Sequence, residues 1–391
     1  MKRDVVLLST ADWDHPFWTN KQHVARSLAQ LGHRVLYVES LGLRPPRLEA
    51  QDLTRILRRL RRGLLPPRRV AEGLWVWSPL LWPAPRTPLQ HRLNRCVFRL
   101  FLALWRRWLG LRADLFWTYN PLTGQVLNLR HHGFRQLVYH CVDDLTAQPC
   151  MPAQLIAAEE EQLCRQADHV FVTSMELLRL RAVFNPHTSY YSNAADLDHF
   201  AQARDQTLPI PPDLQAIAEP RLGFIGAISA YKLDLPLIAQ LAQQRPDCQI
   251  VLIGRLGEGD PSTRLDLLEG LDNVHWLGPR PYAALPAYLR GFDLALLPCP
   301  LNAYTRSMFP MKFFEYLAAG VPVVATQLPA LQEHAHLARL CDGHRAFLAA
   351  VDGLLADARG MGARTPIPLQ SLPPGCSYRG RTEAMLAEIT P

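Results

Sequence analysis

Short apolar runs alternate with longer amphipathic stretches along the whole chain, and this pattern predicts alternating strands and helices. In the first half the predicted strands are residues 5–9, 35–39, 75–77, 115–118, 137–142 and 170–173, with helices at about 20–31, 89–109 and 153–166. In the second half they are residues 221–226, 250–254, 274–278, 294–297 and 321–326. Strands separated by helices of this length form βαβ units and parallel sheets. The pattern therefore predicts an α/β protein with two Rossmann-like halves joined near residues 193–220.

The stretch from Pro310 to Thr326 predicts a short helix followed by a strand that is buried on both faces. Proline suits the first turn of a helix, and Gly320 suits the position just past its end. Lys312 and Glu315 are three residues apart, so they share one face near the start of this helix. A lysine beside free backbone N–H groups favours a diphosphate, and a carboxylate one turn on can accept hydrogen bonds from ribose hydroxyls. The alternative is an ordinary surface Lys–Glu pair.

The same stretch resembles a C-terminal motif of GT-B glycosyltransferases, approximately P-x-K-x-x-E-Y-L-A-x-G-x-P-V-V. In that family the second Glu of a Glu-x7-Glu motif binds the donor ribose, and it corresponds to Glu315. The first Glu corresponds to Ser307, so a role for that position and a retaining stereochemistry are not implied. Residues 190–200 resemble the interdomain signature N-G-V-D-x-x-x-F, with two alanines in place of Gly-Val.

The resemblance covers nearly the whole chain, because residues 273–282 and 292–298 also follow the family pattern. It implies the GT-B fold, in which two Rossmann-like domains face a central cleft, and is strongest to enzymes of polysaccharide assembly, some of them glucuronosyltransferase-like. The expected domains are 1–200 on the acceptor side with a basic insertion at 44–112, then 201–375 for the nucleotide-sugar. Residues 376–391 are expected to form a helix that returns to the first domain.

The composition is that of a globular protein: 391 residues, 48% hydrophobic and 20% charged, enough for two cores. The sequence contains no run of about 18 apolar residues, so no transmembrane helix is predicted. The N-terminus does not have the pattern of a signal peptide. The eight cysteines show no metal-ligand spacing. They predict reduced thiols in a cytoplasmic protein.

Positive charge is concentrated in the first half of the chain. Residues 52–112 contain 14 arginines and only two acids, Asp52 and Glu72. Two segments in this flank, 55–65 and 92–108, interleave arginine with Leu, Phe and Trp at helical spacing, which suits a helix lying on an anionic membrane surface. Nucleic acid is a weaker alternative because no recognised binding motif is present. Arginine-rich solvated faces of ordinary helices are the other alternative.

Two groups of candidate residues follow predicted strands of the first domain, where open α/β sheets bind ligands. Asp143 and Asp144 follow strand 137–142, and one of them, with Asp143 preferred, could take the proton of the attacking hydroxyl. In the resembling inverting enzymes an aspartate of this domain has that role; His140 lies too early to match the His-Asp pair of retaining relatives. A helix cap or a metal pair is the alternative. The loop after the first strand predicts an acceptor-binding surface or an aromatic cluster capping the core, with candidates Trp13, His15, Trp18 and Lys21.

Candidate donor-binding residues occur in the second half. Gly226 lets the chain approach a diphosphate that Lys232 could neutralise, although the family's usual Arg beside this glycine is Ala227. Arg280 stands where relatives contact the nucleobase. The remaining candidates precede or open the central helix: Tyr304, Thr305, Arg306 and Met311, with Lys312 and Glu315.

The sequence thus predicts a metal-independent glycosyltransferase that uses a nucleotide-diphosphate sugar, UDP-sugar foremost, as co-substrate and needs no cofactor. The expected acceptor is lipid-linked or a growing polysaccharide, and the expected place is the inner face of the cytoplasmic membrane, without a nucleic-acid partner. A GT-B-fold nucleotide-sugar epimerase and an inactive nucleotide-sugar-binding protein are the alternatives.

Overall fold

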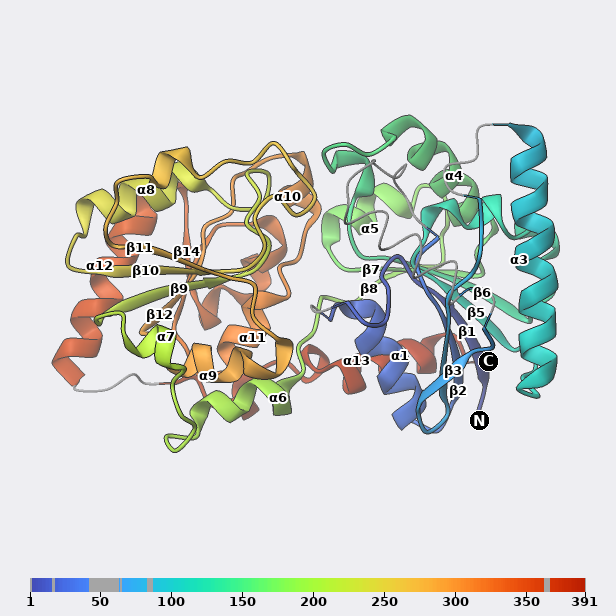
Figure 1. Cartoon of the computed structure of the whole chain (residues 1–391), viewed down its shortest axis with the longest axis horizontal. Helices are drawn as coiled ribbons and strands as arrows, with labels where there is room; N and C mark the ends of the chain where they lie inside the picture. The colour runs from blue at the N-terminus through green and yellow to red at the C-terminus, as the bar shows by residue number, and fades with distance from the viewer. Residues whose placement is uncertain are drawn as a thin grey trace. The chain divides into compact units, whose positions relative to one another are not determined.

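A computed structural model of the chain describes residues 2–15, 18–41, 63, 65–82, 87–361 and 366–390, with the backbone alone at 358–361. The chain divides into two compact units (Figure 1). Unit 1 comprises Met1–Ala147, Met151–Tyr191 and Tyr378–Pro391, and unit 2 comprises Gln148–Cys150 and Ser192–Ser377. The basic segment at 55–62 and the aromatic Phe17 lie outside the described residues.

Unit 1 is built on an eight-stranded sheet in the order β3-β4-β2-β1-β5-β6-β7-β8. The strands are β1 (Asp4–Leu8), β2 (Arg34–Val38), β3 (Arg68–Ala71), β4 (Leu74–Trp77), β5 (Leu115–Thr118), β6 (Gln136–Cys141), β7 (His169–Val172) and β8 (Thr188–Tyr190). All neighbours are parallel except β3 and β4, which form an antiparallel hairpin. The helices are α1 (Asn20–Gln30), α3 (Pro88–Trp108), α4 (Ala153–Gln166), α5 (Met175–Arg181) and α13 (Tyr378–Glu388).

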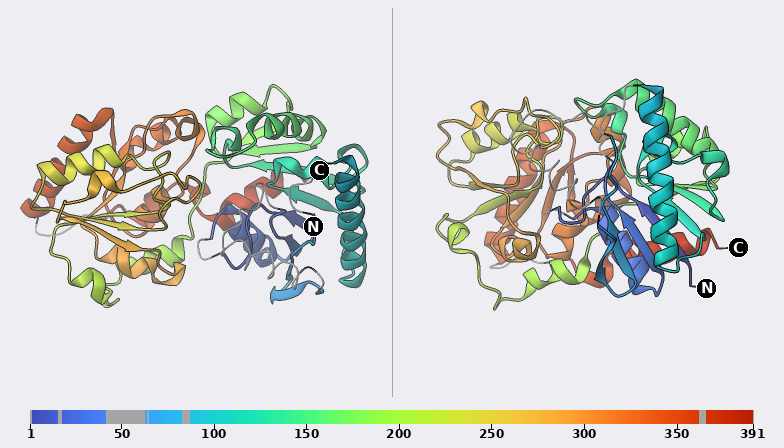
Figure 2. Two further views of the ribbon diagram at one scale, coloured as in Figure 1. Left: turned by 45° about the horizontal axis from the view of Figure 1, so that its top comes forward. Right: turned by 45° about the vertical axis from the view of Figure 1, so that its right-hand side comes forward.

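The helices of unit 1 cover the two faces of its sheet. Phe98 and Leu102 of α3 share one core with α4, α5 and alternate residues of β1, β2, β5, β6 and β7. On the other side α1 and α13 pack together (Figure 2). The rings of His23 and Tyr378 are stacked there with centroids 4.2 Å apart. Strands covered on both faces must be apolar throughout, which explains why the sequence pattern located them.

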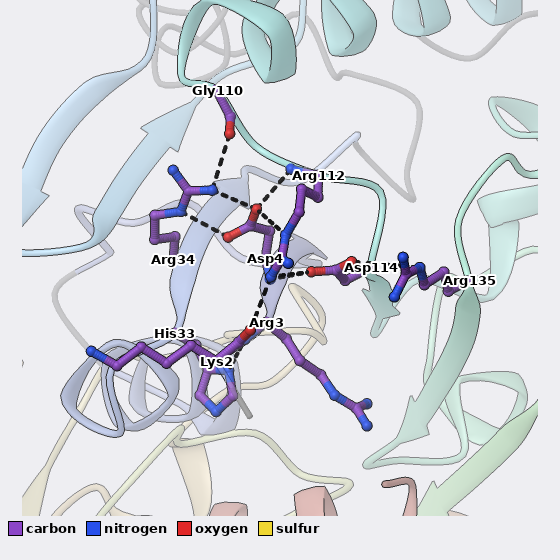
Figure 3. A network of polar contacts seen from close by, with 9 residues as sticks. All are labelled: Lys2, Arg3, Asp4, His33, Arg34, Gly110, Arg112, Asp114 and Arg135. Atoms are coloured by element: carbon purple, nitrogen blue, oxygen red, sulfur yellow. Dashed lines mark hydrogen bonds and ion pairs between the residues drawn. The ribbon is translucent and has the colours of Figure 1, made fainter. Parts of the chain in front are cut away.

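A polar network ties the amino-terminal edge of this sheet together (Figure 3). Asp4, which opens β1 and is buried, accepts hydrogen bonds from the Arg34 guanidinium at 2.6 and 2.8 Å and from the Arg112 backbone N–H at 2.7 Å. Arg112 also contacts Asp114 at 2.9 Å. Because ligands of such sheets bind at the opposite, carboxyl-terminal edge, we regard this network as structural.

Unit 2 is built on a parallel six-stranded sheet in the order β11-β10-β9-β12-β13-β14. The strands are β9 (Arg221–Ile225), β10 (Gln249–Ile253), β11 (Val274–Gly278), β12 (Leu294–Leu297), β13 (Val323–Thr326) and β14 (Arg339–Cys341). The helices are α6 (Leu197–Ala201), α7 (Pro212–Gln215), α8 (Leu235–Gln244), α9 (Leu285–Arg290), α10 (Ala303–Ser307), α11 (Lys312–Ala318) and α12 (Gly343–Met361). One core lies under α6, α9 and α11, and the other under α8 and α12.

The predicted strands are confirmed to within two residues, and three short strands were missed. β3, β8 and β14 are edge strands of four, three and three residues, and none of them is fully buried. An edge strand needs no continuous apolar run because one side of it faces solvent, so the hydrophobic pattern does not reveal it. The β3–β4 hairpin therefore occupies part of what the sequence predicted as an insertion.

Candidate functional site

The stretch singled out in the sequence forms α11 and β13, at the carboxyl-terminal edge of the unit 2 sheet. The helix begins at Lys312, two residues later than predicted, and ends before Gly320, whose φ of +75° favours glycine as expected. The Arg204 guanidinium donates to the carbonyl oxygens of Leu317 and Ala318 at 2.8 and 2.7 Å. It thus provides hydrogen-bond donors for backbone carbonyls in the last turn of α11. The Tyr316 hydroxyl bonds both backbone groups of Ile225 at the end of β9. These contacts fix α11 against the sheet.

Lys312 and Glu315 form an ion pair on one face of α11, as their spacing predicted. The distance between Lys312 Nζ and Glu315 Oε2 is 2.5 Å. The Glu315 side chain is 4% exposed and the Lys312 side chain 21%. Among the described residues, Lys312 provides the only hydrogen bond or ion pair to the Glu315 carboxylate. A buried carboxylate held by one partly exposed lysine is more than an ordinary surface pair.

Gly226 lies where the turns after β9 and β10 touch. Its N–H donates to the Ile253 carbonyl at 2.9 Å. A side chain at Gly254 would place its Cβ 1.7 Å from the Gly226 carbonyl oxygen, so the second turn also requires glycine. The Ile228 N–H then donates to the Arg255 carbonyl at 3.0 Å, and the Ile228 carbonyl accepts from the Gly257 N–H at 2.8 Å, which joins the two loops. The sequence had predicted a close approach of the chain at Gly226, and the structure shows that its neighbour is another backbone segment.

Lys232, in the loop after β9, comes together with Tyr304 on α10, the helix that follows β12. The Lys232 ammonium lies 5.2 Å from the centroid of the Tyr231 ring and 5.3 Å from that of Tyr304. The Asn302 side chain donates to the Tyr231 carbonyl at 2.9 Å and joins the same loops. A cation at this edge of the sheet is thus held against two aromatic faces.

The other donor-side candidates differ in what their side chains already contact. Thr305 completes a capping box with Asn302 at the start of α10, and Arg306 on the same helix is exposed. Arg280 pairs with Asp213 at 2.6 Å and donates to the Tyr288 hydroxyl at 2.7 Å. Because the Arg280 guanidinium already pairs with these two side chains, a contact with a nucleobase at this position would be made by backbone groups. Met311 occupies the N-cap position of α11 and is partly buried.

Position 307 carries no acidic group, as the sequence already indicated. Ser307 is buried and its hydroxyl donates to the Tyr304 carbonyl at 3.1 Å. Asn193, in the segment that resembles the interdomain signature, donates to the Phe309 carbonyl and holds the loop before α11. The sequence analysis did not predict that Asn193 and Arg204 hold α11 and the loop before it. The asparagine of the interdomain signature could have indicated the role of Asn193.

Asp143 and Asp144 follow β6 in unit 1, and the structure distinguishes them. The Asp144 carboxylate accepts from the Thr146 N–H at 3.1 Å and hydroxyl at 2.6 Å, and it lies 3.6 Å from Arg181. Arg181 in turn pairs with buried Glu160 at 2.9 Å. Asp144 thus caps the turn after β6, which agrees with the helix-cap alternative to catalysis, and both aspartates are partly exposed.

The four acceptor-side candidates lie before or at the start of α1. Trp13 is 8% exposed and its ring packs edge-on against Trp18 and Tyr37 at 5.0 and 5.1 Å. This packing fits the core-capping alternative for Trp13. Trp18, His15 and Lys21 are partly exposed, and the Lys21 ammonium lies 5.9 Å from the centroid of the Tyr119 ring.

Helix α3 presents an apolar and basic face to solvent. Phe98 and Leu102 face the core, while five large apolar side chains are between 48% and 75% exposed: Leu89, Leu93, Leu100, Leu104 and Trp108. Five arginines lie on this helix and no acidic residue does. None of the described helices is both long and apolar enough to cross a membrane. Nor do the described residues contain a group of three or more His, Cys, Asp or Glu that could hold a metal ion.

Comparisons with known proteins agree with this architecture. Residues 219–357 match the family model described as glycosyl transferases group 1. TuaH of Bacillus subtilis (strain 168), whose name provisionally assigns it to teichuronic acid biosynthesis as a glycosyltransferase, is 29% identical over 239 residues, or 56% of this chain and 57% of TuaH. The match therefore spans little more than half the length of that relative.

Among solved structures the likeness extends over the whole chain. Sucrose-phosphate synthase of Thermosynechococcus elongatus has a TM-score of 0.64 at 19% identity, covering 98% of this chain and 94% of that one. Anabaena HepE, in complex with UDP and glucose, has a TM-score of 0.62 at 14% identity, covering 97% and 95%. The chain has the GT-B fold with two Rossmann-like domains, and residues 219–357 match the glycosyl transferases group 1 model. The predicted fold class and family resemblance are confirmed.

Proposed function

We propose that this protein is a glycosyltransferase that moves a sugar from a nucleotide-diphosphate sugar, UDP-sugar foremost, to a lipid-linked or polysaccharide acceptor at the membrane face. The observation that carries the proposal is the Lys312–Glu315 pair, 2.5 Å apart on α11, inside the matched group 1 domain. HepE supports the choice of donor because it is a complex with UDP and glucose. The name of TuaH, which refers to teichuronic acid, supports a polysaccharide acceptor.

Unit 2 is assigned the donor. Glu315 accepts hydrogen bonds from the ribose hydroxyls, while Lys312 and Lys232 neutralise the diphosphate near Gly226. Arg306, which is exposed, is assigned to the donor sugar together with Tyr304 on the same helix, α10. The amino-acid set offers cations for the diphosphate, so we propose that turnover needs neither a divalent metal nor a cofactor.

Unit 1 is assigned the acceptor, with Asp143 as the general base. Support for Asp143 over Asp144 comes from the contacts of the Asp144 carboxylate with Thr146 and Arg181, which fix that carboxylate in the turn after β6. A base must reach the hydroxyl proton that it removes. The partly exposed position of Asp143 at the carboxyl-terminal end of β6 suits that task.

Helix α3 is assigned to an anionic lipid surface. Its exposed leucines and Trp108 supply an apolar face, and its arginines without acidic neighbours supply charge complementarity. Each basic residue near an anionic leaflet contributes about 1 kcal/mol, screened by salt. Co-sedimentation with anionic but not neutral vesicles, weakened by Arg95→Gln with Arg99→Gln or by Leu100→Gln with Leu104→Gln, is the expected result.

Exposed residues elsewhere in unit 1 provide matched controls for α3. Arg130→Gln and Leu155→Gln change the same side-chain types on the surface and should leave vesicle binding unchanged. Equal loss in these controls, or no binding of the wild type to anionic vesicles at low salt, would remove the membrane from the proposal.

Donor binding and transfer are tested together with purified full-length protein. A thermal-shift screen against UDP-, GDP- and dTDP-sugars identifies the nucleotide, and radiolabelled donor with membrane extract detects transfer to lipid or polymer. Conversion of the donor sugar into an epimer without any acceptor would favour the epimerase. Binding without hydrolysis, transfer or conversion would favour the inactive binding protein.

A further inference from the structure

The turn that carries Asp143 and Asp144 contacts a buried ion pair of unit 1 to which the proposed function gives no role. The Arg181 guanidinium, at the end of α5, lies 3.6 Å from the Asp144 carboxylate and donates to the Glu160 carboxylate of α4 at 2.9 Å. The side chains of Arg181 and Glu160 are 9% and 6% exposed. Among the described residues, Arg181 is the only cationic side chain that pairs with either carboxylate.

Glu160 accepts two further hydrogen bonds, both from β6. The Tyr139 hydroxyl donates to its Oε1 at 2.5 Å, and the Cys141 thiol lies 3.4 Å from the same oxygen. Burial raises the pKa values of Tyr139 and Cys141 well above their usual ranges, so both groups keep their protons and can donate. Because Glu160 is bonded to β6 on one side and to Arg181 on the other, it fixes the place of Arg181 relative to that strand.

The backbone of the turn is also held, at two successive carbonyls. The Thr173 hydroxyl, just after β7, donates to the Val142 carbonyl at 2.8 Å, and the Cys141 thiol lies 3.6 Å from the Asp143 carbonyl. Each residue from 142 to 144 is therefore in contact with a buried side chain. Of these three contacts, only the one at position 144 joins two charged groups.

We infer that Arg181, held in place by Glu160, is a positioning residue for the base Asp143. By pairing with Asp144, it fixes the turn in which Asp143 is the preceding residue. A base must lie within hydrogen-bond distance of the proton that it removes, and a displacement of about 1 Å can lower the rate about a hundredfold. This inference rests on the proposed function, because it assigns a further residue to the same site.

The alternative is that the Arg181–Glu160 pair only holds α4 and α5 together, and two variants distinguish these roles. Arg181→Gln leaves Glu160 buried without its cation, so it should lower both the Tm and the turnover. Arg181→Gln with Glu160→Gln removes both charges of the pair. We expect the Tm of this double variant to recover towards the wild type. Its turnover should stay about ten- to a hundredfold low, because the Asp144 side chain has still lost Arg181.

Turnover is measured with purified full-length protein, membrane extract and a radiolabelled form of the UDP-sugar that gives the largest thermal shift. The temperature is kept below the unfolding transition of the least stable variant. The loss should be in kcat and should leave the KM for the UDP-sugar unchanged, because the residues assigned to the donor are in unit 2. Arg179→Gln is the matched control: it breaks the exposed pair with Glu176 on the same helix and should keep the wild-type kcat.

A double-mutant cycle tests whether Arg181 acts through Asp143. Asp143→Asn removes the carboxylate that Arg181 positions, so adding Arg181→Gln should lower the remaining rate by no more than about twofold. An independent structural role would lower it by the same factor as in the wild type. Asp144→Asn keeps an oxygen to which Arg181 can donate, so its kcat should fall far less than that of Arg181→Gln.

The outcomes distinguish this inference from the proposed function. If Arg181→Gln keeps the wild-type kcat, if the double variant with Glu160→Gln regains kcat together with the Tm, or if the effects of Arg181→Gln and Asp143→Asn multiply, Arg181 is only structural and the inference is wrong. If Asp143→Asn turns over like the wild type, the assignment of the base fails and this inference fails with it. If the wild type neither binds a UDP-sugar nor transfers sugar from it, the proposed function itself fails.

Discussion

Replacing Lys312 and Glu315 singly and together tests whether their pair binds a ligand or only supports α11. In Lys312→Ala the Glu315 carboxylate, 4% exposed, loses the lysine that lies 2.5 Å away. An unpartnered buried charge is strongly destabilising, by about 3–5 kcal/mol when fully buried. Because Lys312 is 21% exposed and water can replace it in part, we expect the lower range of about 1–3 kcal/mol. For a unit of this size that corresponds to a fall in Tm of roughly 2–12 °C.

Donor affinity changes by a different rule. A hydrogen bond to a charged group contributes roughly 1.5–3 kcal/mol, so losing Lys312 or Glu315 should weaken binding of a UDP-sugar about ten- to a hundredfold. In the double variant Lys312→Ala with Glu315→Gln no charge is left buried. We therefore expect the Tm to recover towards the wild type while the affinity remains low.

Isothermal titration calorimetry and thermal unfolding measure the two quantities on the same samples. Arg179→Ala breaks a comparable i, i+3 pair with Glu176 on α5 of unit 1, 2.6 Å apart, and serves as the control that leaves UDP affinity unchanged. If the double variant regains both stability and affinity, or if Glu315→Gln binds the donor like the wild type, the pair is structural and the donor assignment is wrong.

Three further predictions concern the base, the metal and the pH dependence. Asp143→Asn should lower kcat by at least about a hundredfold, whereas Asp144→Asn should mainly lower the Tm; the reverse ranking in steady-state kinetics would exchange their roles. Turnover should persist in EDTA, and loss of activity that magnesium or manganese restores would contradict metal independence. Burial alone would raise the pKa of Asp4, but Arg34 and Arg112 lower it below its usual value. The stability that Asp4 adds is therefore complete above about pH 4 and is lost as the pH falls through the lowered pKa. Asp4→Asn should cost roughly 1–3 kcal/mol of unfolding free energy at neutral pH, and its urea midpoint should converge with that of the wild type in strong acid.

Much of the fold and part of the donor side could be predicted because their signals are local. A central parallel strand is covered on both faces, so β9, β10 and β12 appear in the sequence as continuous apolar runs. The spacing of Lys312 and Glu315 places them on one helical face whatever surrounds the helix. These features depend on a few neighbouring residues, which the sequence contains.

The remaining features depend on contacts between residues that are far apart in the chain. Asp213 pairs with Arg280, which is 67 residues away in the sequence, and Asp144 pairs with Arg181, which is 37 residues away. The spacing of residues in the sequence therefore does not reveal either ion pair. In the sequence, His140 was noted only as lying too early for the His-Asp pair of retaining relatives. The folded chain shows that its ring is completely buried and that neither ring nitrogen has a hydrogen-bond partner among the described residues. Long-range packing determines which polar groups are satisfied and which remain available to a ligand, because burial removes the water that would otherwise satisfy them all.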